Sequence, residues 1–240
     1  FIMSTSPISA RAEESAIDVS TACDGYFTVL YQSALQVKMK VGVTRDSDTV
    51  YYCYVPGTAS TYAFTGGNGE YTITLYRNVS GTTYRSVTST CVDVEMDDPM
   101  APYLASTDEI TFSANDTVGQ KAAELCSGLT GDGDKVAAIY RYMAANFTYD
   151  HTLGRQVARG EVVNYVPNTA QILEHKTGIC YDFSTLFAAM CRSQGIPCAI
   201  AKGYLNGGYH AWNMVYVDGV WNAVDITRAI SNRDSDAASL

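Results

Sequence analysis

The apolar residues of this chain change their period near the middle, and this change constrains the fold more than any other feature of the sequence. Within residues 25–96, apolar and polar residues alternate over short runs such as 26–31, 35–41 and 49–55. Clusters of turn-forming residues, such as 65–69, separate these runs. Short alternating runs at this spacing are typical of an antiparallel sandwich, so we predict an all-β, immunoglobulin-like domain.

Helical spacing replaces this pattern after Asn115. We predict a helix that begins at Asp116 or Thr117 and ends near Cys126. A second predicted helix carries one buried stripe of apolar residues, which are Val136, Ile139, Tyr140, Met143 and Phe147. Strands in one half and helices in the other predict an α+β chain.

The stretch between the two patterns predicts a domain boundary. Pro99 and Pro102 lie there, and proline continues neither a central strand nor a helix interior. We therefore predict a β-sandwich domain over residues 1–105 and an α+β domain over residues 106–240.

Composition narrows the possible functions. The chain has 240 residues, of which 47% are hydrophobic, so it can build a substantial core. Its 16 Lys and Arg against 25 Asp and Glu give a net charge of -9, so nucleic acid is not an expected partner. No run of about 18 apolar residues occurs, and we expect no membrane span. The chain opens with Phe1, which leads us to expect a removed signal peptide and a secreted or cell-surface protein.

The seven cysteines are many for a reducing cytoplasm. They form no CxxC pair, and only three histidines accompany them, so we expect neither a metal site nor a cofactor. Up to three disulfides and one free thiol fit the odd number, and Cys53 and Cys91 could form one such pair. Alternatively, the cysteines are buried and pack as small apolar side chains. The sequence leaves both alternatives open.

Cys180 has the setting that most favours reactivity. It opens a third helical pattern, whose buried face includes Phe183 and Phe187 and which ends at residues 195–197. A thiol in the first turn of a helix faces unpaired backbone N–H groups and the positive end of the helix dipole, which favour the thiolate. We therefore predict that Cys180 is a nucleophile near neutral pH. Cys191, three turns further along, is expected to pack or to form a disulfide.

A base and an acid for this thiol follow in the next predicted strands. Runs 198–204, 210–217 and 220–225 predict antiparallel hairpins. His210 opens the second run and Asp225 closes the third, so the two side chains can face each other. An imidazole can accept the thiol proton and later donate a proton to the leaving group, while a carboxylate fixes its tautomer.

Trp212 follows His210 by two residues, so both point to the same face of a strand, where the indole could wall a cleft. Ordinary core packing is the alternative for Trp212. We expect the remaining histidines to lie outside the site, His151 on the surface and His175 in a loop.

Three blocks, 177–183, 209–213 and 224–227, together resemble the transglutaminase-like superfamily of cysteine enzymes. The resemblance extends over roughly residues 122–227 and keeps the order Cys, His, Asp. It implies a papain-like α+β fold in which the nucleophile lies on a helix packed against an antiparallel sheet. It also implies the catalytic triad Cys180, His210 and Asp225. Bacterial secreted members often carry an immunoglobulin-like domain ahead of the catalytic one.

The resemblance implies acyl transfer, and nothing in the sequence resembles the calcium-binding loops of animal transglutaminases. We expect substrate contacts from Trp212, Tyr181 and Gln171, the last as a side-chain amide that could assist the oxyanion. A polar tail is expected from residue 231 onward.

Two classes of function follow. The first is a secreted or cell-surface cysteine protease, amidase or transglutaminase-like acyltransferase that forms a thioester on Cys180. Its substrate would be a protein or peptide, for example a cell-wall peptide. The second is a non-enzymatic cell-surface binding or adhesion module that keeps the fold. An intracellular protein with reduced thiols is a third, less favoured alternative. The sequence decides neither between water and an amine as acyl acceptor nor the oligomeric state.

Overall fold

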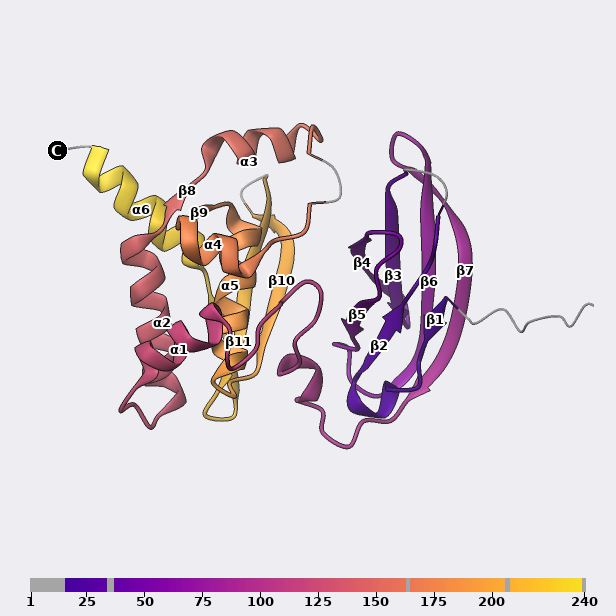
Figure 1. The fold of residues 1–240 in the computed structure, drawn as a ribbon, viewed down its shortest axis with the longest axis horizontal. Helices are drawn as coiled ribbons and strands as arrows, with labels where there is room; N and C mark the ends of the chain where they lie inside the picture. The colour runs from indigo at the N-terminus through magenta and orange to yellow at the C-terminus, as the bar shows by residue number, and fades with distance from the viewer. Residues whose placement is uncertain (1–15, 34–36, 163–164, 206–207, 239–240) are drawn as a thin grey trace, which may run out of the picture.

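The computed structural model describes residues 16–33, 37–162, 165–205 and 208–238, with side chains up to residue 233. Part of the run expected at 35–41 therefore lies outside the described residues, as does the start of the chain. Figure 1 shows the strand-rich N-terminal half beside the helix-rich C-terminal half, with the connecting segment between them. The chain is mixed α/β, as the change of period predicts.

The N-terminal half contains two antiparallel sheets. The first has the order β1 (Ile17–Asp18), β2 (Tyr26–Val29), β5 (Ser60–Ala63). The second has the order β4 (Asp48–Tyr54), β3 (Met39–Arg45), β6 (Gly69–Ser80), β7 (Thr83–Val94). A short 3-10 helix, η1 (Ala22–Asp24), precedes β2.

The two sheets share one hydrophobic cluster, because alternate side chains of each strand point inward. On β2, for example, Phe27 and Val29 are buried while Tyr26 and Thr28 are only partly covered. Strand β4 pairs with β3 in the second sheet, whereas β5 pairs with β2 in the first sheet. The immunoglobulin-like assignment itself stays a prediction.

Cys53 and Cys91 cannot form the disulfide that we considered. They lie on β4 and β7, the two outer strands of the second sheet, with β3 and β6 between them. Three strand spacings amount to about 14 Å, about twice the Cα separation that a disulfide tolerates. All seven cysteines fall within the described ranges and are free thiols. Cys126, Cys191 and Cys198 are buried, which supports the alternative of cysteines as small apolar side chains.

The C-terminal half is built around one central helix, α5 (Cys180–Ser193), in which each residue from 182 to 192 is buried. One side of α5 packs against an antiparallel sheet in the order β10 (Cys198–Leu205), β11 (Gly208–Val217), β12 (Val220–Val224). Helices α1 (Thr117–Cys126), α2 (Asp132–Asn146), α4 (Thr169–His175) and α6 (Ile226–Ala238) also pack against α5.

The remaining elements of this half are short. Strand β8 (Thr148–Tyr149) comes before helix α3 (His151–Ala158), and strand β9 (Thr177–Gly178) comes directly before α5. The two strands form a parallel pair. In Figure 1, β10 lies on the side of this half that faces the N-terminal strands, and α1 and α2 lie on the far side.

The helices follow the predicted patterns closely. Asp116 caps α1 by accepting a hydrogen bond from the Gly119 N–H, as expected. The expected stripe on α2 is confirmed, since Ile139, Met143 and the following Phe147 are fully buried.

Residues 226–238 form helix α6, which includes the polar tail from residue 231 onward and whose apolar side reaches the core. Ile226 and Ile230 pack into the hydrophobic cluster of the C-terminal half. The sequence did not predict this helix, because only its first turns have apolar residues on one side and the rest is polar.

The two halves have separate hydrophobic clusters, one drawn from residues 17–96 and the other from residues 110–230. The segment between them includes the short 3-10 helix η2 (Ala101–Tyr103) and contacts both halves. The Tyr103 ring packs against Trp221, with ring centroids 4.8 Å apart, and the Ala105 carbonyl accepts a hydrogen bond from Arg192. The domain boundary after residue 105 stays a prediction.

Candidate active site

Cys180 is the first residue of α5, as the sequence predicts. The buried carboxylate of Asp182 holds this first turn, because one oxygen accepts the Ile179 N–H at 2.8 Å and the other accepts the Tyr165 hydroxyl at 2.7 Å. Gly178 packs against the same side chain, and a Cβ there would lie 2.7 Å from the Asp182 Cβ. The turn that carries the thiol is therefore fixed by its own close neighbours.

His210 and Asp225 face each other, as expected from the hairpin. Nε2 of His210 lies 3.0 Å from Oδ2 of Asp225, and both side chains are mostly covered. The other carboxylate oxygen accepts the Arg228 N–H at 3.1 Å, at the start of α6. This arrangement orients the imidazole so that Nδ1 remains for proton exchange with another group.

The thiol of Cys180 lies beside the strand that carries His210. The backbone of Ala211, the residue after His210, and that of Tyr181 lie beside the Cys180 sulfur, where they lower the pKa of the thiol. α5 also packs directly on β11. The fold thus places the Cys180 thiol beside the strand that carries His210, and close enough to Asp225 for this carboxylate to raise the thiol pKa.

Burial raises the pKa of the Cys180 thiol above its ordinary value. The N–H groups of Ala211 and Tyr181 lower this pKa, but burial has the larger effect, and the nearby carboxylates raise the pKa further. The low thiol pKa that we expected from the helix N-terminus alone is therefore not found. Because Cys180 favours the neutral thiol, its conversion to a nucleophile depends on a base.

Trp212 lies next to the imidazole, on the same face of β11 as expected. The two rings stack with centroids 6.1 Å apart and an interplanar angle of 19°. Gly203, on the neighbouring strand, leaves space for the indole, because a Cβ there would lie 3.2 Å from Trp212. A role for Trp212 in substrate binding stays a prediction.

Tyr181 contacts the connecting segment. Its hydroxyl donates a 2.6 Å hydrogen bond to Glu109, and the Lys202 ammonium lies 4.3 Å from its ring centroid. Lys202 is the cross-strand partner of Ala211, so the Lys202 side chain lies on the sheet face opposite to that of His210. A role for Tyr181 in substrate binding stays a prediction.

Gln171 is exposed on α4, and its backbone N–H donates a hydrogen bond to the side chain of Asn168, which caps this helix. Within the described ranges, no hydrogen bond of its side-chain amide is found, and nothing brings that amide to Cys180. The structure places the backbone N–H of Ala211 near the thiol, and the oxyanion role of Gln171 stays a prediction. A main-chain donor has no sequence signal, which is why sequence reasoning missed it.

The other two histidines lie outside the site. His151 is exposed at the start of α3, with its ring 5.1 Å from that of Tyr149, as expected for a surface residue. His175 is the last residue of α4 and not part of a loop.

Sequence reasoning also missed Asp182 and Glu109. An acidic residue three positions into a helix is a known signal for contact with the N-terminal backbone, and it could have pointed to Asp182. Glu109 joins the site only through tertiary contacts.

Among the residues that the structure describes, no group of three or more His, Cys, Asp and Glu side chains is placed to hold a metal ion. No helix in the described ranges is long and apolar enough to cross a membrane.

Sequence comparison supports the family resemblance. Residues 119–226 match the model of the transglutaminase-like superfamily. Kyphoscoliosis peptidase from Mus musculus is 27% identical over 135 residues, which are 51% of this chain and 19% of that protein. The uncharacterized protein YebA from Bacillus subtilis is 32% identical over 114 residues, which are 43% of this chain and 15% of that protein. The chain therefore spans less than a fifth of each of these relatives.

Two solved structures resemble this chain more distantly. A candidate cysteine protease from Cytophaga hutchinsonii has a TM-score of 0.48 and 18% identity, over 87% of this chain and 73% of that chain. The periplasmic domain of TgpA from Pseudomonas aeruginosa, bound to ethylmercury, has a TM-score of 0.45 and 15% identity, over 88% of this chain and 91% of that chain. The match to the transglutaminase-like superfamily over residues 119–226 agrees with the resemblance that we described from the three blocks.

Proposed function

We propose that this chain is a cysteine enzyme that transfers or hydrolyses acyl groups at peptide or amide bonds, through a thioester on Cys180. The observation that carries the proposal is the 3.0 Å contact between His210 and Asp225 beside a thiol that burial keeps neutral. A buried neutral thiol is a poor nucleophile, whereas the same thiol next to an oriented base is a catalytic one.

In the first half of the proposed reaction, Nδ1 of His210 accepts the thiol proton while the Cys180 sulfur attacks the carbonyl carbon. A carbon–sulfur bond forms, and the carbonyl electron pair moves to oxygen. The N–H groups beside the sulfur, including that of Ala211, are suited to stabilise the developing negative charge. When the carbon–nitrogen bond breaks, the imidazolium returns its proton to the leaving amine.

In the second half, water or an amine attacks the thioester. His210 takes a proton from this acceptor and returns it to the thiolate, which restores the free enzyme. Asp225 accepts a hydrogen bond from Nε2 in both halves, and so it stabilises the imidazolium without being protonated. Hydrolysis and transamidation differ only in the acceptor.

The substrate class that we propose is a protein or peptide. We also propose, from the family resemblance, that the protein is secreted or exposed on the cell surface and that residues 1–105 form an immunoglobulin-like domain. Fractionation of the producing cells tests the location. Limited proteolysis tests the division, and cleavage confined to residues 97–110 is expected.

An acyl-enzyme experiment tests the function directly. The chain is mixed with an activated ester of a peptide, quenched in acid and analysed by peptide-resolved mass spectrometry. We expect an acyl group on Cys180 that hydroxylamine removes, and no such group in Cys180→Ser. The exposed thiols Cys23, Cys53 and Cys91 serve as internal references. Acylation of these references with none at Cys180 would refute the enzyme and favour a binding module.

A further inference from the structure

Glu109 lies in the segment between the two halves and contacts two elements of the active-site half. One oxygen of its carboxylate, Oε1, accepts a hydrogen bond from the Tyr181 hydroxyl and forms an ion pair with the Lys202 ammonium. The Glu109 and Lys202 side chains are only 14% and 23% exposed, so solvent screens this pair weakly. The carboxylate thus joins the connecting segment to α5 and to β10.

Each partner of Glu109 is adjacent to the proposed machinery. Tyr181 directly follows Cys180 in the first turn of α5. Lys202 is the cross-strand partner of Ala211, which follows His210 and whose backbone lies beside the Cys180 sulfur. The Glu109 carboxylate therefore contacts both the first turn of α5, which carries the Cys180 thiol, and strand β10, which pairs with the strand of His210, β11.

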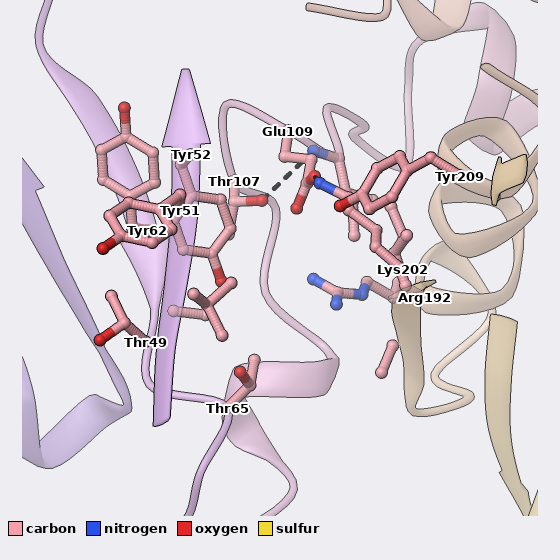
Figure 2. Close-up of a pocket in the computed structure, with 15 residues that line it drawn as sticks. Thr49, Tyr51, Tyr52, Tyr62, Thr65, Thr107, Glu109, Arg192, Lys202 and Tyr209 are labelled. Carbon is pink, nitrogen blue, oxygen red and sulfur yellow. Dashed lines mark hydrogen bonds and ion pairs between the residues drawn. The ribbon is translucent and has the colours of Figure 1, made fainter. Parts of the chain in front are cut away.

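The surroundings of Glu109 include the N-terminal half. A cavity of about 330 Å³ separates β4 from β10, and Glu109, Lys202, Arg192 and Tyr52 line it. Figure 2 shows Glu109 and Lys202 on the far wall of this cavity, opposite the tyrosines of β4. The Lys202 ammonium lies 5.9 Å from the ring centroid of Tyr52 on β4. The ion pair is therefore placed where the two halves meet.

We infer that Glu109 is a positioning residue for the proposed reaction. By holding Tyr181 and Lys202 together, it sets the placement of Cys180 relative to His210 and links the reactivity of the thiol to the contact between the halves. The inference rests on the proposed function. Its physical basis is that small displacements of reacting groups cost large factors in rate, about 100-fold for 1 Å.

The test measures the rate of Cys180 alkylation by iodoacetamide as a function of pH in the full chain, with site-resolved mass spectrometry and a thermal melt for every variant. Glu109→Ala removes both contacts, and we expect about a tenfold loss of the His210-dependent rate near neutral pH. Glu109→Gln can still accept from Tyr181, so it should recover part of the rate. Tyr181→Phe should give a smaller loss and add little to Glu109→Ala, because both remove the same link.

Glu124→Ala is the matched control. Glu124 also pairs with a lysine, Lys121, at 2.7 Å, but it lies on the surface of α1, away from the first turn of α5. This variant should alkylate like the parent chain.

The outcomes separate the two proposals. If His210→Ala shifts the alkylation profile while Glu109→Ala and Tyr181→Phe lower only the melting temperature, then Glu109 merely joins the halves and the positioning role is refuted. If His210→Ala leaves the profile unchanged, the proposed function itself fails. Should Glu109→Ala not fold, Tyr181→Phe decides alone, and a parent-like profile for it overturns the inference.

Discussion

The Asp225 carboxylate binds His210 with one oxygen and the first turn of α6 with the other. Its contact with Nε2 orients the imidazole, and its contact with the Arg228 N–H caps the helix. The acid of the proposed triad is thereby fixed by a hydrogen bond that the catalytic step does not use. The site consequently depends on an element that lies beyond the matched family segment.

Removal of the base should change how Cys180 responds to pH. Burial raises the pKa of the thiol, so without a base the thiolate forms only as the pH rises through that raised value. We expect the alkylation profile of His210→Ala to shift to higher pH than that of the parent chain, with loss of turnover. The measurement is the site-resolved alkylation rate between about pH 5 and pH 10, a range that spans the ordinary His and Cys values.

Asp225→Asn is the complementary variant. Asparagine can still cap α6, so the melting temperature should hardly change, whereas the imidazole loses its orienting charge. We expect turnover to fall by roughly 10⁴-fold, as in other triads. Profiles of the parent chain, His210→Ala and Asp225→Asn that superimpose would contradict the triad.

Trp212→Ala should affect the site more than the fold. The indole stacks on His210 and is only partly buried, so its loss should free the imidazole and lower acylation of Cys180. Trp212→Phe keeps a stacked ring and should retain most of the rate. A variant that lowers the melting temperature while Cys180 reacts at the parent rate would show that Trp212 is ordinary packing.

Gly178→Ala should destabilise the chain. The added Cβ would meet the Asp182 Cβ at 2.7 Å, which would push the carboxylate away from the Ile179 N–H. We expect a loss of about 2 kcal/mol in the free energy of unfolding, together with slower acylation. Gly133→Ala is the control, because its Cβ would meet Val217 at 3.7 Å, within a helix that favours alanine. Equal denaturation midpoints for Gly178→Ala and the parent would refute the close contact.

Asp182 should make stability depend on pH. Burial raises the pKa of this carboxyl, although the Ile179 N–H and the Tyr165 hydroxyl lower it in part. Because this pKa is higher in the folded chain than the unfolded value of about 3.9, the protonated carboxyl stabilises the folded state. This contribution is fully present below the unfolded pKa, and it is lost as the pH rises through the folded pKa. Asp182→Asn does not titrate, so its stability relative to the parent should rise over that window. A difference that is constant with pH would show that the carboxyl pKa is not raised.

Sequence patterns predicted the elements of the active-site half well, because local signals place them. Helices α1 and α2 have clear caps or apolar stripes, and the three strands that carry His210 and Asp225 are separated by turns. The thiol, imidazole and carboxylate could be named because their order in the sequence matches that of the family.

The features that the sequence did not predict are set by tertiary contacts. Tyr181 is directed toward Glu109 by contacts between segments that are far apart in the sequence, and no local pattern encodes them. Likewise, burial raises the pKa of Cys180, although its position in the helix favours the opposite. Helix α6 was not predicted because most of its residues are polar and its two core isoleucines are too few to form a clear helical pattern.

The position of α6 has a consequence for heat inactivation. The first turn of a helix can open locally at a lower free energy than the whole domain unfolds, and Asp225 is held by the first turn of α6. Each opening would leave the imidazole without its partner while the rest of the chain stays native. On warming, acylation of Cys180 should therefore decline several degrees before the cooperative melt, and amide hydrogen exchange at Arg228 should report the same early event.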